Sequence, residues 1–291
     1  MVVYMAVVWM SLYIMLCSLQ FIFIKGYQKK CGVSWTSAVW FSAVMYGMMA
    51  VILFCANGFE VRFTAGSFLL AVLFGCTAVI ANFASIKAVG FGKVSTVSMF
   101  VLIGSAILPF LFGILIINEQ MTVFKLCSVI LMCAAFLPNI LKEKGSRAGK
   151  GFIWLCILNA AVNGLATVIM KMGQMAGLSG MQFMMQAGIA GSLLSFLLLG
   201  FLLLGSKQKA ERFEPVSLGY ALLYALSNGF GMVASIQAAG LVDTSVEFPV
   251  ASGGILVLTS LLSFFIYREK LKKYDYISIV TAIAAMVLFV F

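Results

Sequence analysis

The sequence predicts an all-α polytopic membrane protein, in which ten transmembrane helices form two inverted five-helix repeats. Three observations favour this fold class. Of the 291 residues, 63% are apolar and only 10% are charged, and the mean hydropathy is +1.12. Ten apolar runs without charged residues follow one another, and the two halves of the chain resemble each other. A water-soluble protein of this length could not bury so much apolar surface, so lipid must solvate most of it.

Each run is read as a helix that crosses a bilayer, which takes about 20 apolar residues. A helix satisfies its own backbone hydrogen bonds in lipid, and no regular alternation of polarity indicates a membrane β-barrel. The first run lacks a basic flank and a cleavage site, so we expect a span there and not a signal peptide. The expected helices lie at 3–24, 34–56, 65–87, 93–117, 122–141, 152–171, 180–204, 216–238, 244–267 and 273–290.

An internal repeat relates the two halves of the chain. A shift of 150 places residues 84–119 over 234–269 with eleven of 36 positions identical, including five of seven in ASIKAVG over ASIQAAG. A shift of 146 places FIFIK at 21–25 over TVIMK at 167–171. Because five is odd, the halves 1–145 and 146–291 enter the membrane from opposite sides. Inverted repeats in transporters hold a binding site near the midplane, between the halves.

Three short segments lie at matching places along the chain. They are CSLQF at 17–21 with Lys25, SIKA at 85–88, and NEQMT at 118–122 with its second copy REKL at 268–271. In these segments the chain resembles the drug/metabolite transporter superfamily, in its EamA-like form with ten helices. It departs from that pattern by lacking a tryptophan and a glycine in the first span, and by having Pro109 where the second half has Thr259. The resemblance implies a transporter of small organic metabolites.

Composition disfavours several other functions. The chain has no His, which removes His-based acid–base catalysis and His metal ligation, and its seven Cys show no CxxC spacing. No nucleophile motif and no cluster of acids is present, so we expect no enzyme, no cofactor and no metal. We attribute the net charge of +10 to lysines that flank the spans, and not to a nucleic-acid surface.

Neutral polar side chains within the spans are candidates for substrate binding, because hydrocarbon offers them no hydrogen-bond partner. They should face one another or a wet cavity. With one acid added, the candidate substrate-binding residues are Gln20, Asn82, Asn163, Gln186, Asn228 and Glu247. We also expect Gly104 and Gly254 to let the fourth and ninth spans pack closely.

Glu247 is the only carboxylate that we place inside a span and not at a turn. Its counterpart in the first half is Val97, so the fold itself does not need an acid there. Pro249 cannot donate a backbone hydrogen bond to residue 245, which leaves polar backbone beside the acid. An ionisable group inside the bilayer indicates a function by default, and we expect Glu247 to face the same cavity as Gln20. The alternative is an interfacial acid in headgroup water.

The leading interpretation is a secondary transporter that exports a small amphipathic metabolite, such as an amino acid, by alternating access. Two other transport functions stay open: the movement of anionic phosphorylated metabolites or nucleotide sugars, and the export of organic cations coupled to protons through Glu247. The expected partners are the solute and the lipid of the inner (plasma) membrane, with proton coupling as an option and no nucleic acid. A monomer and a homodimer are both compatible with the sequence.

The distribution of positive charge predicts that both termini lie outside the cytoplasm. Loops after odd-numbered spans hold 16 of the 19 Lys and Arg residues, and the positive-inside rule places such loops in the cytoplasm. The family resemblance implies the opposite orientation. A reporter that is active only in the cytoplasm, fused at Phe291, should therefore stay silent, whereas the same reporter inserted at Lys209 should be active. Activity at Phe291 would refute the argument from charge.

Overall fold

Apolar segments of 16 to 30 residues fold as ten helices in the computed structural model. The structure describes residues 2–31, 34–62, 64–91, 94–143, 150–205, 215–268 and 273–288, and this described part contains no strand. The helices are α1 (Val2–Cys31), α2 (Trp35–Ala56), α3 (Ala65–Phe91), α4 (Val94–Leu115), α5 (Val123–Glu143), α6 (Lys150–Met175), α7 (Gly180–Gly205), α8 (Pro215–Ala239), α9 (Thr244–Tyr267) and α10 (Lys273–Leu288).

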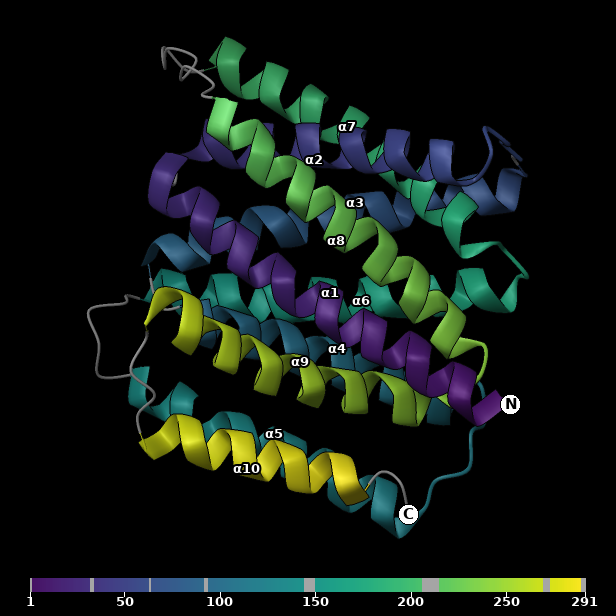
Figure 1. Cartoon of the computed structure of the whole chain (residues 1–291), viewed down its shortest axis with the longest axis vertical. Coiled ribbons are helices and arrows are strands. Elements are labelled where there is room, and N and C mark those ends of the chain that lie inside the picture. The colour runs from purple at the N-terminus through teal and green to yellow at the C-terminus, as the bar shows by residue number, and fades with distance from the viewer. Residues whose placement is uncertain are drawn as a thin grey trace.

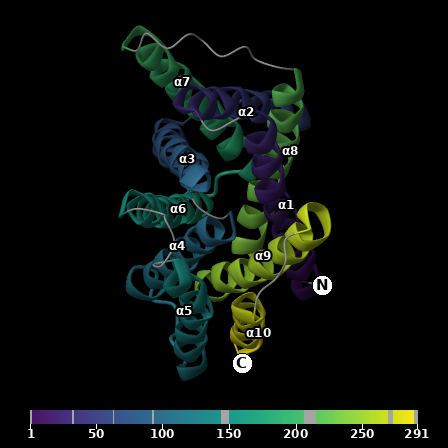
Figure 2. The same ribbon diagram turned by 90° about the vertical axis from the view of Figure 1, so that its left-hand side faces the viewer.

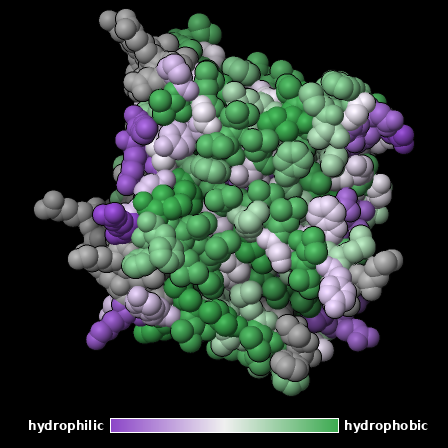
Figure 3. Space-filling model, viewed as in Figure 1, coloured by the Kyte–Doolittle hydropathy of each residue, from purple (hydrophilic) through white to green (hydrophobic). Residues whose placement is uncertain are grey.

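Eight of the helices, α1–α4 and α6–α9, are long and apolar enough to cross a membrane. The described residues of α5 and α10 contain shorter apolar stretches, Val123–Ala135 and Tyr276–Leu288. On the face that Figure 3 shows, apolar residues cover the middle and polar residues gather along two edges. The described part of the chain is all-helical, which confirms the predicted all-α class, and its eight long apolar helices are those of a multi-pass membrane protein.

Three helices continue by four or more residues beyond the ends expected for them. α1 runs to Cys31, α3 to Phe91 and α6 to Met175, so that Lys25 and Lys171 lie inside helices and do not end them. Both lysines are 8% exposed. The Lys25 ammonium lies 4.4 Å from the centroid of the Tyr267 ring, and the Lys171 ammonium donates a 2.8 Å hydrogen bond to the Ala239 carbonyl. A tyrosine ring and a backbone carbonyl stabilise these two ammonium groups. Neither lysine therefore has to reach water, and both helices can continue past it.

The helices stack in pairs along the long axis of the molecule. α2 packs on α7 at one end of this axis, and α5 packs on α10 at the other (Figures 1 and 2). Between these pairs, α1 packs on α8 and α9, α6 packs on α3 and α4, and α4 contacts α9. Six helices therefore surround the centre, three from each half of the chain. The two chain termini lie at the same end of the helices (Figure 1).

The two glycines that were expected to join α4 to α9 face other helices. A Cβ atom on Gly104 would overlap the backbone carbonyl of Ala160 in α6, and a Cβ atom on Gly254 would lie 2.7 Å from Cδ1 of Ile14 in α1. α4 and α9 also contact each other. Gly104 and Gly254 instead allow the close α4–α6 and α1–α9 packing.

The difference between these two contacts predicts graded effects of alanine on stability. Gly104→Ala meets rigid backbone and should cost about 1–3 kcal/mol, the usual penalty of overpacking. Gly254→Ala should cost less, because the Ile14 side chain can move aside. Gly200→Ala in α7 is the control, since nothing lies within 4 Å of its Cβ position, and it should raise stability slightly through helix propensity. Thermal unfolding of each variant in one detergent measures the order. Equal stability of the Gly104 and Gly200 variants would contradict it.

Candidate functional site

A cavity of about 100 Å³ lies among α1, α2, α3, α4, α6, α8 and α9. Four of the six residues proposed from the sequence line it: Gln20, Asn82, Asn163 and Asn228. The other polar side chains on its wall belong to serine, threonine, cysteine and tyrosine, and the lining residues include no Lys, Arg, Asp or Glu. The described wall of the cavity therefore offers hydrogen bonds, and no formal charge, to a solute.

Asn82 ties together three helices on one side of the cavity. Its Nδ2 donates a 2.8 Å hydrogen bond to the Tyr46 hydroxyl in α2, and its Oδ1 accepts a 3.2 Å bond from the Tyr224 hydroxyl in α8. All three side chains are buried. Tyr46 accepts in this arrangement, so its own hydroxyl proton stays available to a ligand.

Three amide side chains have carbonyl oxygens that accept no hydrogen bond from the residues that the structure describes. Asn163 donates through Nδ2 to the backbone and side-chain oxygens of Asn159, at 2.8 and 2.6 Å. Gln20 and Asn228 donate only to sulfur, at 3.4 Å to Cys17 and 3.6 Å to Met49. Sulfur is a weak acceptor. These amides can accept hydrogen bonds from an amino or amide group of a solute, and two of them can donate more strongly than they do here.

Gln186 is not among the residues that line the cavity, although it was expected to bind the solute with the other five candidates. α7 packs on α2 and α3 at one end of the bundle, away from the six central helices. The Gln186 amide donates a 2.8 Å bond to the Arg62 carbonyl, in the segment between α2 and α3. Its Oε1 is buried without a partner among the described residues. We assign Gln186 to packing against this connection.

Glu247 lies behind the wall of the cavity and is not one of its lining residues. It is fully buried, so it is not an acid in headgroup water either. Its Oε1 accepts a 3.1 Å hydrogen bond from Ser235 of α8, and its Oε2 has no partner among the described residues. Ser235 also bonds to Tyr13, and Tyr13 does line the cavity. One hydroxyl pair therefore separates the acid from the cavity.

Sequence reasoning missed the tyrosines of the site because they fall in apolar runs. Tyr13, Tyr46 and Tyr224 all line the cavity. Helical spacing could have found two of them. Tyr224 precedes Asn228 by four residues, and Tyr13 precedes Gln20 by seven, so each shares a helix face with an amide that was identified.

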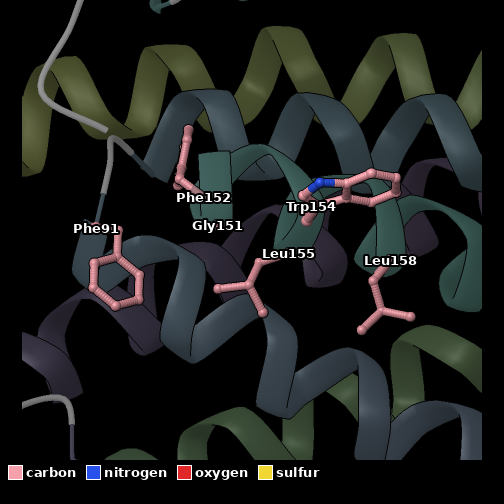
Figure 4. Close-up of a pocket in the computed structure, with 6 residues that line it drawn as sticks. All are labelled: Phe91, Gly151, Phe152, Trp154, Leu155 and Leu158. Carbon is pink, nitrogen blue, oxygen red and sulfur yellow. The ribbon is translucent and has the colours of Figure 1, made fainter. Parts of the chain in front are cut away.

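A larger hollow of about 610 Å³ does not have the chemistry of a solute site. Its lining comes mainly from the first turns of α6, with Phe91 from the end of α3, as Figure 4 shows (Phe91, Gly151, Phe152, Trp154, Leu155 and Leu158). Trp154 is 69% exposed on this surface, and the ring nitrogen of its side chain is the only side-chain polar atom in the lining. An apolar hollow of this kind suits lipid chains.

Contacts between the two halves lie at both ends of α9. At its start, the Lys125 ammonium of α5 bonds to Asp243 at 3.2 Å and to the Ser245 hydroxyl at 3.1 Å, while Glu119 accepts a 2.9 Å bond from the Ser245 backbone nitrogen. At its end, the Tyr267 hydroxyl donates a 2.6 Å bond to the Ile22 carbonyl of α1. Contacts of charged side chains thus hold the start of α9, whereas the hydrogen bond of a tyrosine hydroxyl holds its end.

The fold has a counterpart among solved structures. No family model matches the chain, and neither does any curated protein. A crystal structure described as "Crystal structure of protein" is similar over 97% of this chain and 95% of its own, with a TM-score of 0.71 and 12% sequence identity. At this identity the similarity concerns the fold alone.

Proposed function

We propose that the protein is a secondary transporter of a small organic solute that carries an amino group and no net charge, such as an amino acid, and that it works by alternating access. The observation that carries the proposal is the central cavity, whose polar groups come from both halves of the chain and include no charged side chain. In this proposal the ten helices form two inverted repeats of the EamA-like drug/metabolite transporter kind and sit in the plasma membrane.

Contacts that occur twice support the inverted repeat. Gly104 and Gly254 correspond by the shift of 150, and Ala160 and Ile14, which they face, correspond by the shift of 146. The α4–α6 contact in one half is thus repeated as the α9–α1 contact in the other. Two unrelated helix pairs would not place matching residues against each other in this way.

A second repeated contact has the same relation. Asn159 of α6 donates a 2.7 Å hydrogen bond to Ser85 of α3. The counterpart of Ser85 is Ser235, and the counterpart of Asn159 is Tyr13, which bonds to Ser235. The polar contact is preserved between the halves although one partner has changed from an amide to a phenol.

The cavity wall itself is built from corresponding positions. Eight pairs of lining residues are related by the same two shifts: Cys17 with Asn163, Gln20 with Ala166, Phe21 with Thr167, Phe74 with Tyr224, Ala78 with Asn228, Asn82 with Met232, Leu102 with Ser252, and Ser105 with Ile255. A cavity on the axis that relates the halves would have this lining. In every pair one member is apolar, or is the weakly polar cysteine, and the other carries a stronger hydrogen-bonding group. The wall is therefore symmetric in position and asymmetric in chemistry, which favours one orientation of a bound solute.

The size of the cavity limits the solute. Liquid water takes about 30 Å³ per molecule, so a cavity of about 100 Å³ has room for roughly three waters. A solute with a handful of non-hydrogen atoms matches this volume, whereas a nucleotide sugar does not. The uncharged wall also disfavours phosphorylated solutes, because a buried anion without a cationic partner is costly.

Exchange of a labelled neutral amino acid tests the proposal directly. Liposomes that contain the protein and unlabelled alanine should take up radiolabelled alanine from outside, but should not exchange glucose 6-phosphate. Exchange of the phosphate ester without exchange of alanine would overturn the proposed substrate class. Exchange of methylammonium alone would favour an organic cation instead.

Loss of single amides should weaken this exchange. Asn163→Leu and Asn228→Leu each remove one hydrogen bond to the solute, worth about 1–1.5 kcal/mol, so each should raise the half-saturating alanine concentration by about tenfold. Gln182→Leu in α7 is the matched control, since it makes the same chemical change outside the cavity lining. An equal loss in all three variants would mean that the cavity is not the binding site.

A further inference from the structure

We infer that Glu247 is a proton-binding site separate from the solute cavity, and that Tyr13 and Ser235 pass the proton between the cavity and this carboxylate. Three observations carry the inference: the acid is fully enclosed, one of its oxygens has no partner among the described residues, and Ser235, which donates to its other oxygen, neighbours Tyr13 of the cavity wall. The coupling of this proton site to transport rests on the proposed function, whereas proton binding by Glu247 does not.

The direction of the hydrogen bonds suits proton transfer. Ser235 donates its only hydroxyl proton to Oε1 of Glu247 at 3.1 Å. Its oxygen can then accept the proton of the neighbouring Tyr13 hydroxyl. In this arrangement each hydroxyl along the path can pass its proton toward the carboxylate.

One transfer balances without any other reactant. A water in the cavity gives a proton to the Tyr13 oxygen, the Tyr13 proton passes to the Ser235 oxygen, and the Ser235 proton passes to Oε1 of Glu247. The products are a neutral carboxylic acid and one hydroxide in the cavity, and a hydronium ion from the bulk solution converts this hydroxide to water when the cavity opens. Tyr13 and Ser235 return to neutral hydroxyls, and the reverse sequence releases the proton.

The charges around Glu247 permit both of its states. Lys171 of α6 attracts the ionised carboxylate, and Glu119, after α4, opposes it. Lys125 and Asp243 form their own pair, at 3.2 Å, beside Ser245. α4 itself contains no charged residue, and the charged residues of α10, Lys273 and Asp275, lie at its start, which is near the other end of α9. One cation and one acid thus act on Glu247 in opposite senses.

Separation of the proton from the solute has a mechanistic consequence. A solute in the cavity touches Tyr13 but does not reach Glu247 in this conformation. Coupling then comes from the hydroxyl pair, because a solute that bonds to Tyr13 competes with the water that would feed protons into the path.

The inference is tested by infrared spectroscopy after a pH jump, on the protein in liposomes without any solute. The parent should show a carboxylic-acid carbonyl band that appears on acidification and is missing in Glu247→Gln. In Tyr13→Phe the band should form about a hundredfold more slowly, the usual contribution of a positioned proton donor. Tyr27→Phe is the matched control, because it removes a buried hydroxyl of the same helix that bonds to Ser37, away from the cavity. Its band should form at the parent rate.

Two results would overturn the inference. If the band never forms, Glu247 is a permanently ionised partner of Lys171. If it forms at the parent rate in Tyr13→Phe, the proton arrives by another route, such as past Asp243 at the start of α9.

A transport measurement separates this inference from the proposed function. Glu247→Gln should abolish alanine accumulation driven by an imposed pH gradient but keep alanine exchange at equal pH and normal thermal stability. If the parent exchanges no alanine while the band behaves as expected, the proposed substrate is wrong and the proton site stands. If exchange occurs and the band is absent, the reverse holds.

Discussion

A polar group in hydrocarbon has no water to bond with, and most of this structure follows from how the chain meets that constraint. Helices satisfy the backbone. Side chains then bond to one another across helices, as Asn159 does with Ser85 and Asn82 with Tyr46 and Tyr224. Gln20 and Asn163 line one cavity, and within the described part of the chain their amide oxygens accept no hydrogen bond. The same constraint thus separates the polar residues that hold helices together from those that a solute can complete.

Much of the fold could be predicted from the sequence, because the thickness of a bilayer imposes a length on every span. The helix ends at Lys25 and Lys171 were misjudged for one reason: a lysine was assumed to reach water, whereas a Tyr267 ring and an Ala239 carbonyl receive it. The candidate site could also be predicted only in part. Helical periodicity finds the polar face of a span but not the helix that this face meets, so Gln186 lies against the α2–α3 connection and Glu247 against Ser235.

The correspondence between the two halves of the sequence accounts for many of the positions that line the cavity, but not for the chemistry of their side chains. Positions such as Asn82 and Met232 correspond in the two halves, yet only one of them can hold a solute by hydrogen bonds. The backbone arrangement needs merely that both side chains fit at the same distance from the axis. Chemistry at these positions is free to differ, and here it differs in all eight pairs. Glu247 and its counterpart Val97 also differ in chemistry, although neither is among the lining residues.

The helix crossings at Gly104 and Gly254 differ in how far they can yield. At Gly104 the backbone of α4 rests on the backbone of α6, whereas at Gly254 the flexible Ile14 side chain lies between α9 and α1. Backbone cannot be compressed, but an isoleucine can change rotamer. If the halves rock against each other, the α4–α6 crossing should stay fixed and serve as the pivot. The α1–α9 crossing can shift, because the Ile14 side chain can change rotamer. A transporter built from two similar halves would then open toward one face by a stiffer movement than toward the other.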